Sequence, residues 1–366
     1  MMGTLLKEEA IIFELVNMLH KMISLEDTLK LDNIMYIDMR SPNEFEMGHI
    51  PGAVNIPLFS NEERAEVGTI YKNTGTEEAK MKGLAIVSTK LPELVSQVRS
   101  LHKKGSTVVV YCWRGGMRSK SIVTILEIMG ITAYQLLGGY KAYRRHVLDS
   151  LEKFNLVPPI VVLCGSTGVG KTILLNKLHK QGIPVIDLEA LANHRGSAFG
   201  QVGLGKSATA QNFDANLLER LQLLSTEPYI VVECESKRVG NVYLPEVLYN
   251  AMQKGTKILV KASTETRIQR LIAEYAGIYD DNYESIMASI KTLSKRLGIK
   301  KAQKLIQDFS QGKTHEVVGT LLVDYYDPLY GYETCDPADY GMVIDAENLD
   351  QTADYLISYL NQQFRR

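Results

Sequence analysis

The chain has 366 residues, of which 45% are hydrophobic and 23% charged, a composition typical of a globular protein of about two domains. Its formal net charge is −1, so the overall charge gives no support for nucleic-acid binding. A nucleic-acid partner would need a local basic patch. The four cysteines lack the close spacings of disulfide scaffolds and zinc sites. Acidic residues interrupt the apolar part of residues 1–16, and no uncharged apolar run reaches membrane-spanning length. We therefore expect a cytoplasmic protein with no signal peptide and no membrane partner.

The first half of the chain alternates between predicted strands and helices. Strands are expected at IMYID, AVNIPL, TVVVYC and AYQLLGG, with NEFEMG and a longer helical region between them. A break follows the helical stretch GYKAYRRHVLDSLEKF, where NLVPP begins. This pattern predicts a small α/β domain over residues 1–150 and a second domain over residues 151–366.

The segment YCWRGGMRSKS places a cysteine between a buried strand and a helix that is expected to end at Gly130. Cys112 therefore begins a loop whose backbone N–H groups converge at a helix N-terminus, a geometry that stabilises anions and favours a thiolate. Arg114 and Arg118 add positive charge beside it. We interpret Cys112 as a nucleophile with two arginine partners. The alternative is a structural cysteine at a strand end.

The second half begins a new alternation, with strands expected at PIVVLCGS, IPVIDLE, YIVVECE and KILVKAS. From Thr264 the chain is expected to be mostly helical, with a late strand at GMVIDA. This pattern predicts an α/β domain with a mostly helical C-terminal part.

The first of these strands leads into GSTGVGKT, which fits the phosphate-binding loop pattern GxxxxGK[ST]. Gly165, Gly168 and Gly170 permit backbone conformations in which successive N–H groups point at phosphate oxygens. Lys171 is expected to reach the terminal phosphates, and Thr172 to help hold a magnesium ion. The motif predicts diphosphate binding without specifying which diphosphate.

Acidic residues follow the two neighbouring strands. YIVVECES offers Glu233 and Glu235, and IPVIDLE offers Asp187 and Glu189. A nucleotide hydrolase usually has an aspartate at the end of such a strand. In this chain the acidic group is displaced from that position or substituted, which disfavours nucleotide hydrolysis.

The segment LANHRGSAFGQVGLGKSA is too rich in glycine for a helix and too cationic for a core loop. It carries Arg195, and two interpretations stay open: a flap over an anionic ligand, which we favour, or a solvent-exposed turn. Arg238, just after the acidic strand, is a further candidate for phosphate binding.

Two basic stretches are candidates for contact with a nucleic acid. IKTLSKRLGIKKAQKLIQ contains Lys295, Arg296, Lys300 and Lys301, and YKAYRRH is a second candidate. A solvated helix face is the equally weighted alternative for both.

The first half resembles a rhodanese domain in IDMRSPNEFEMGHIPGAVNIP and in the loop YCWRGGMRS. The loop departs from the common sulfurtransferase pattern C-x-x-G-x-R, because five residues separate Cys112 from Arg118. That length matches the Cx5R loop of tyrosine-type phosphatases, although Tyr111 stands where those enzymes usually have histidine.

The combination of the two halves with DLEALANHRGSAFG and VVECESKRVGNVYLP resembles the tRNA 2-selenouridine synthases from about Tyr36 to Tyr332. The resemblance implies conversion of wobble 2-thiouridine to 2-selenouridine, through S-geranylation with geranyl diphosphate and then selenation with selenophosphate. It implies that the phosphate-binding loop holds the diphosphate with a magnesium ion positioned by Glu233 or Asp187. It also implies that Cys112 accepts or relays selenium while Arg114 and Arg118 bind the selenophosphate anion.

The implied macromolecular partner is the tRNA anticodon loop carrying 2-thiouridine, with Lys295 to Lys301 contacting its backbone. Tyrosines in LLVDYYDPLYGYETCD are expected either to stack on RNA bases or, with slightly more weight, to pack a helix on the core. The alternatives in other classes are a kinase or NTPase with a rhodanese-like module, an RNA-binding protein with an inert first domain, and a phosphatase.

Overall fold

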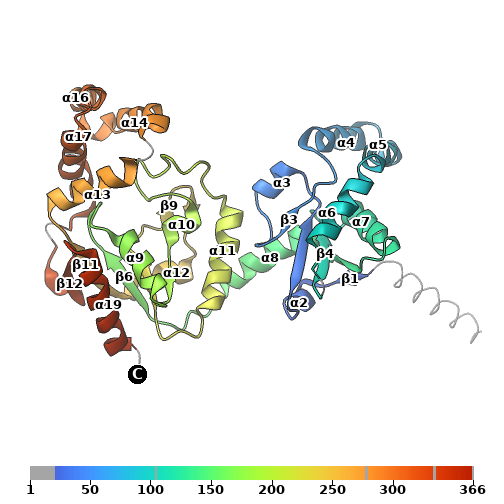
Figure 1. Ribbon diagram of the computed structural model, residues 1–366, viewed down its shortest axis with the longest axis horizontal. Coiled ribbons are helices and arrows are strands. Elements are labelled where there is room, and N and C mark those ends of the chain that lie inside the picture. The colour runs from blue at the N-terminus through green and yellow to red at the C-terminus, as the bar shows by residue number, and fades with distance from the viewer. Residues whose placement is uncertain (1–20, 104, 277–278, 333–334, 365–366) are drawn as a thin grey trace, which may run out of the picture. The chain divides into compact units, whose positions relative to one another are not determined.

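The computed structural model describes residues 21–103, 105–276, 279–332 and 335–364 (Figure 1). Residues 1–16, on which the expectation about a signal peptide rests, lie outside the described residues. The chain divides into two compact units, Met1–Ser150 and Leu151–Arg366. Within the described residues, every helix is too short or too polar to cross a bilayer.

The first unit is built on a parallel sheet with the strand order β1-β5-β4-β2-β3. Its strands are β1 (Met22–Ile23), β2 (Ile34–Asp38), β3 (Val54–Asn55), β4 (Thr107–Tyr111) and β5 (Ala133–Leu136). Asp38 at the end of β2 pairs with Tyr111 at the end of β4. The residues that follow these strands therefore meet at one edge of the sheet.

Helices flank this sheet and complete its core. They are α2 (Leu25–Thr28), α3 (Pro42–Glu46), α4 (Asn61–Asn73), α5 (Thr76–Ser88), α6 (Leu91–Leu101), α7 (Met117–Ile128) and α8 (Gly139–Glu152). The buried side chains of β2 and β4 form a core with those of α6 and α7. The helix α4 begins at a capping box in which Ser60 and Glu63 satisfy each other's backbone N–H groups.

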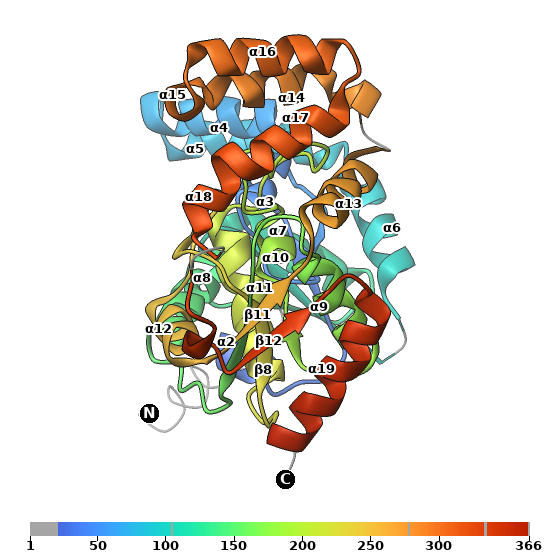
Figure 2. The same cartoon turned by 90° about the vertical axis from the view of Figure 1, so that its left-hand side faces the viewer.

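The second unit has its own parallel sheet, with the strand order β12-β11-β6-β8-β7. Its strands are β6 (Ile160–Cys164), β7 (Val185–Ile186), β8 (Ile230–Glu233), β11 (Thr256–Lys261) and β12 (Met342–Asp345). The helices α9 (Lys171–Lys180) and α19 (Leu349–Phe364) share a hydrophobic core with this sheet. Figure 2 shows strands β11 and β12 of the sheet beside α9. Further helices of this unit are α10 (Leu188–Ala192), α11 (Ala210–Leu223) and α12 (Glu246–Lys254), and β9 (Arg238–Val239) pairs antiparallel with β10 (Val242–Tyr243).

A helical part follows β11 and has a separate hydrophobic core. It comprises α13 (Thr264–Ala276), α14 (Tyr279–Thr292), α15 (Ser294–Leu297), α16 (Ile299–Ser310), α17 (Thr314–Leu321), a π-helical turn (Leu322–Tyr326) and α18 (Asp327–Tyr330), with a short 3₁₀ turn (Pro337–Asp339) before β12. The α/β fold class, the mostly helical C-terminal part and the late strand are thus confirmed.

Candidate functional site

Cys112 lies directly after β4, at the carboxyl edge of the first sheet. Its thiol is 3% exposed and accepts a hydrogen bond from the Gly116 backbone N–H, with an N···S distance of 3.2 Å. The Sγ atom also lies 3.3 Å from the Ser119 hydroxyl. The Cys112 sulfur thus contacts one backbone N–H and one hydroxyl group of the residues that follow it in the loop.

A side chain from the neighbouring strand shapes this loop. The Gln135 amide of β5 donates hydrogen bonds to the carbonyl oxygens of Gly115 and Gly116, at 2.8 and 3.1 Å. Gly139 closes the loop from the other side, because a Cβ atom there would lie 2.2 Å from the Cys112 carbonyl oxygen. The sequence analysis did not identify Gln135, since nothing in the motif itself points to a residue about 20 positions away.

The two arginines of the loop have different surroundings. Arg114 is exposed to solvent. Arg118 donates to the Glu44 carboxylate of α3, with N···O distances of 2.6 and 3.3 Å. Burial raises the pKa of Glu44, but the hydrogen bonds and charge of Arg118, together with the Ser41 N–H and the charge of Arg64, outweigh this and hold the pKa below its usual value. An anion at Cys112 therefore has to compete with Glu44 for the Arg118 guanidinium.

A buried ion pair supports the same edge of the sheet. Arg40 and Asp38 are 1% and 0% exposed, and the Arg40 Nε atom lies 3.0 Å from both Asp38 carboxylate oxygens. The guanidinium also lies 4.0 Å from the centre of the Tyr140 ring. Tyr111 is buried and its hydroxyl accepts from the Ile50 N–H. The tyrosine that replaces a phosphatase histidine is thus a structural residue.

The phosphate-binding loop joins β6 to α9 at the carboxyl edge of the second sheet. Gly165 has φ +146°, and a Cβ atom there would lie 2.4 Å from the Val260 carbonyl oxygen. Gly168 and Gly170 have φ values of +83° and +95°. Lys171 donates from Nζ to the Gly165 carbonyl oxygen at 2.9 Å. The predicted strand, loop and helix context is confirmed, and the glycines have the backbone conformations that the motif requires.

Two arginines of α13 brace this loop from outside. Arg267 is 2% exposed, donates to the Thr167 carbonyl oxygen at 2.8 Å, and pairs with Asp327 at 3.1 and 2.5 Å. Arg270 donates to the Val169 carbonyl oxygen at 2.7 Å. Sequence analysis missed both residues, although a pair of arginines three positions apart on one helix face was a usable signal.

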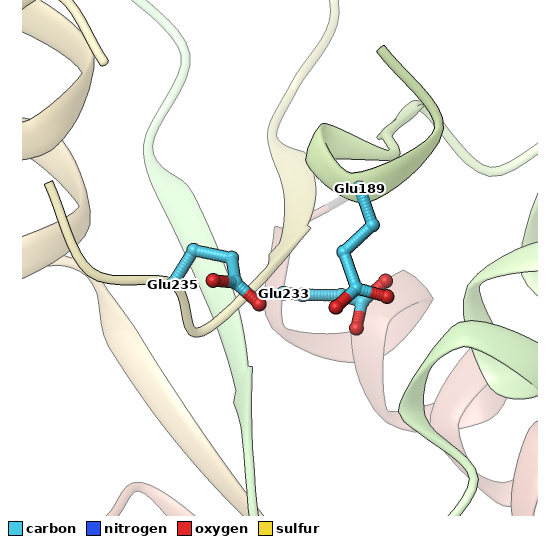
Figure 3. Close-up of side chains that lie close together, drawn as sticks. All are labelled: Glu189, Glu233 and Glu235. Atoms are coloured by element: carbon cyan, nitrogen blue, oxygen red, sulfur yellow. The ribbon is translucent and has the colours of Figure 1, made fainter. Parts of the chain in front are cut away.

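Three glutamates meet beside the loop. Glu233 ends β8, Glu235 follows two residues later, and Glu189 comes from α10 after β7 (Figure 3). One carboxylate oxygen of each lies within 4.8 Å of the others. The Thr172 hydroxyl lies 3.2 Å from a Glu233 oxygen and 3.5 Å from a Glu189 oxygen. The strand order β6-β8-β7 explains this meeting, because adjacent parallel strands end at the same edge.

Burial and mutual repulsion alter the acidity of this cluster. Burial first, and neighbouring carboxylates second, raise the pKa of Glu189 and of Glu233 to about 8, and of Glu235 to about 7. Lys171 acts in the opposite direction on all three. Glu233 is 1% exposed, and its Oε1 atom has no hydrogen-bond partner among the described residues. A buried carboxylate oxygen without a partner is a costly arrangement that a bound cation would relieve.

The donor set fits a magnesium ion, since it consists of carboxylate and hydroxyl oxygens next to a phosphate-binding loop. Thr172 and Glu233 were both expected here. Asp187 instead caps α10, where its carboxylate accepts from the Ala190 N–H at 2.8 Å. Glu189 and Glu235 occupy the place that the sequence analysis considered for Asp187.

The glycine-rich segment after α10 lies against the glutamate cluster. A Cβ atom on Gly196 would lie 2.7 Å from a Glu189 oxygen, so this close approach requires glycine. Arg195 does not extend into the phosphate-binding loop: it pairs with Glu274 at 2.7 Å and donates to the Val202 carbonyl oxygen. Its predicted phosphate contact therefore requires this pairing to change.

The remaining predicted site residues lie on the surface of the second unit. Arg238 is exposed and donates to the Gly240 carbonyl oxygen at 2.8 Å. The four basic residues of α15 and α16 that the sequence analysis singled out are all exposed, namely Lys295, Arg296, Lys300 and Lys301. Tyr326 is buried in the helical core, whereas Tyr330 is exposed and stacks with Tyr332 at a ring distance of 5.9 Å. The tyrosine segment thus supplies both core packing and an aromatic pair in which Tyr330 is exposed and Tyr332 is half-buried.

Comparison with known proteins identifies both units. Residues 21–146 match the rhodanese-like domain, and residues 158–363 match the tRNA 2-selenouridine synthase AAA domain. These matches confirm a rhodanese-like domain followed by a P-loop domain.

Three relatives carry the name tRNA 2-selenouridine synthase. The protein from Hydrogenovibrio crunogenus is 35% identical, over 84% of this chain and 91% of its own. Those from Sulfurovum sp. and Nitrosomonas eutropha are 34% and 32% identical, over 84% and 80% of this chain and 90% and 87% of theirs. This chain therefore belongs to the tRNA 2-selenouridine synthase family.

Proposed function

We propose that this protein is a tRNA-modifying transferase that converts wobble 2-thiouridine to 2-selenouridine, by S-geranylation with geranyl diphosphate and then selenation with selenophosphate. Membership of a family whose relatives are named for selenouridine synthesis supports the overall conversion. The observation that carries the two-step scheme is the presence of two anion-binding loops with different side chains, one with a thiol and one with a lysine and carboxylates.

In the first step the sulfur of 2-thiouridine attacks C1 of the geranyl group. The C1–O bond breaks, its electron pair leaves on the diphosphate, and N3 of the base loses its proton. The N–H groups of the phosphate-binding loop and Lys171 bind the diphosphate and stabilise the charge that grows on it. Magnesium, held by Thr172 and the three glutamates, would add Lewis-acid stabilisation of the leaving group.

In the second step selenium replaces the alkylated sulfur at C2. Alkylation converts the thiocarbonyl sulfur into a leaving group. Water hydrolyses the P–Se bond of selenophosphate, which releases phosphate and a hydroselenide ion. This ion attacks C2, the C2–S bond breaks, and the sulfur departs as geranylthiol with a proton from the phosphate. Cys112, with the Gly116 N–H directed at its sulfur, relays the hydroselenide ion to C2 without forming an S–Se bond. Arg114 contacts the anion from the solvent side, and Arg118 does so when it leaves Glu44.

The second unit also offers surfaces suited to RNA. The exposed cations of α15 and α16 contact phosphates of the RNA, and Tyr330, which is exposed and stacks on the half-buried Tyr332, is a platform for an unstacked base. With tRNA as its substrate, the enzyme works in the cytoplasm.

The test is nucleoside mass spectrometry on tRNA that carries 2-thiouridine. The protein and magnesium are incubated with geranyl diphosphate alone, with selenophosphate alone, and with both. We expect S-geranyl-2-thiouridine from the first mixture, unchanged thiouridine from the second, and 2-selenouridine from the third. Unchanged thiouridine in all three mixtures refutes the proposed function. Selenouridine from selenophosphate alone refutes the geranylated intermediate.

A further inference from the structure

The helical part of the second unit encloses a cavity that the steps above do not use. Side chains from α13, α14, α16, α17 and the π-helical turn surround about 80 Å³ of space, and its lining is almost entirely apolar. Protein interiors contain few voids larger than one water molecule. By the same measure a single water needs about 10–15 Å³, so this cavity is several times larger than a packing defect of that size.

One end of the cavity adjoins the phosphate-binding loop. Thr167 of the loop and Ser197 of the glycine-rich segment both belong to its lining. Leu271 of α13 lines the cavity and also packs on the loop, since a Cβ atom on Gly168 would lie 3.2 Å from its Cδ1 atom. The cavity and the phosphate-binding loop therefore share a wall.

The opposite end is formed by helices remote from the sheet. Ile290 of α14 and Phe309 of α16 line the cavity there, and Figure 2 shows both helices farther from the sheet than α13. Phe309 stacks on Tyr283 of α14, with ring centres 5.3 Å apart. This aromatic pair links the two helices where Phe309 lines the cavity.

A ligand that occupies both places needs two different chemical ends. The loop binds phosphate oxygens, whereas an apolar cavity offers no hydrogen bonds to a polar group and favours hydrocarbon. The volume suits a short branched chain rather than a long one. We propose that this cavity binds the hydrocarbon chain of the prenyl diphosphate, and that Ile290 and Phe309 set the maximum chain length. This inference rests on the proposed function.

Binding measurements separate the cavity from the loop. Isothermal titration calorimetry with the full chain and magnesium compares inorganic pyrophosphate with the diphosphates of 5-, 10- and 15-carbon prenyl chains. We expect the 10-carbon compound to bind at least tenfold more tightly than pyrophosphate, because each buried methylene contributes about fourfold to affinity. The 15-carbon compound should gain no further affinity, since the end lined by Ile290 and Phe309 leaves no room for it.

Two variants test the assignment against a matched control. Leu321→Phe places a ring in the cavity, and we expect it to abolish the advantage of the 10-carbon compound without changing pyrophosphate affinity. Leu305→Phe makes the same substitution in the same core away from the cavity lining, and should keep that advantage. Phe309→Leu opens the end away from the loop and should raise the affinity of the 15-carbon compound relative to the 10-carbon one. Thermal melting establishes that each variant is folded.

The outcomes distinguish this inference from the proposed function. If pyrophosphate and the prenyl diphosphates bind the wild-type protein equally, or if folded Leu321→Phe and Phe309→Leu keep wild-type preferences, the cavity does not hold the chain. The proposed function survives that result as long as the wild-type protein still geranylates thiouridine in tRNA. If neither pyrophosphate nor any prenyl diphosphate binds, both the inference and the proposed function are wrong.

Discussion

The Cys112 loop and the phosphate-binding loop are alike in their backbones and different in their side chains. Each follows the end of a buried parallel strand and leads into a helix. Each is held by hydrogen bonds to its own carbonyl oxygens, from Gln135 in the first unit and from Lys171 and Arg267 in the second. Satisfying the carbonyl groups leaves the N–H groups free to face an anion.

The difference lies in the charges around each loop. The first site holds a thiol, and Arg118 of its loop is paired with the Glu44 carboxylate. The second site collects three carboxyl groups whose pKa values are raised by burial and by one another. The same backbone cradle is thus suited to a nucleophile in one unit and to a cation–diphosphate pair in the other. Backbone geometry selects for an anion, and the surrounding side chains select the reaction.

Removing Lys171 or Cys112 is the strongest test of the proposal that the two loops carry out different steps. We expect Lys171→Ala to slow geranylation by about 10²–10³-fold, since it removes a positive charge from the leaving group. Cys112→Ala should leave geranylation intact and cause S-geranyl-2-thiouridine to accumulate. Nucleoside mass spectrometry over time measures both steps, with Lys177→Ala and Cys335→Ala as controls. If both test variants stop at the same step, the two sites are not separate.

The buried residues Arg267 and Arg40 allow a comparison of the residues that support the two loops. Arg267→Ala leaves Asp327 without its partner and should lower the free energy of unfolding by about 3–5 kcal/mol. It should also weaken pyrophosphate binding, because the Thr167 carbonyl loses its donor. Arg40→Ala should destabilise the first unit while leaving pyrophosphate affinity unchanged. Urea unfolding and calorimetry check both results, and equal pyrophosphate affinity in the two variants contradicts the bracing role of Arg267.

The raised pKa values predict how pH acts on the second site alone. In the folded, magnesium-free protein the glutamates keep protons that the unfolded chain releases above about pH 4.5. Their contribution to stability is therefore complete below about pH 4.5 and is lost progressively as the pH rises from there to about 8. We expect the melting temperature in EDTA to fall over this range, and magnesium to bind more tightly as protons leave. A Glu233→Gln variant that keeps the full pH dependence excludes this cluster as its source.

Neutralising the carboxylate beside Arg118 sharpens the description of the first site. Glu44→Gln weakens the hold on the guanidinium and removes a negative charge near Cys112. We expect the KM for selenophosphate to fall by a few fold, with geranylation unchanged. A rise in this KM instead shows that Glu44 positions Arg118 for the anion.

The basic face of α15 and α16 should give the smallest effects. Lys295→Ala and Lys300→Ala are each expected to weaken tRNA binding by a few fold and to reduce the dependence of affinity on salt concentration. Fluorescence anisotropy at several salt concentrations measures this, with Lys254→Ala on α12 as a surface control. An unchanged salt dependence identifies these lysines as a solvated helix face.

Local patterns in the sequence were sufficient for the fold class and for the two loops. Strand, glycine-rich turn and helix are adjacent in the chain, so the positions of Cys112, Lys171 and Thr172 follow from short-range spacing. The strand order that brings Glu189 and Glu235 to Glu233 was not contained in any such spacing, and neither was the capping role of Asp187.

Only the tertiary structure decided which distant side chains serve each loop. Gln135, Glu44, Arg267 and Arg270 act on residues between about 20 and 100 positions away, through contacts that the packing of helices on the sheets creates. The apolar cavity likewise exists only because four helices and a π-helical turn close around it. A sequence records which residues can bind an anion or bury a hydrocarbon, but their convergence is set by long-range packing, which local patterns do not encode.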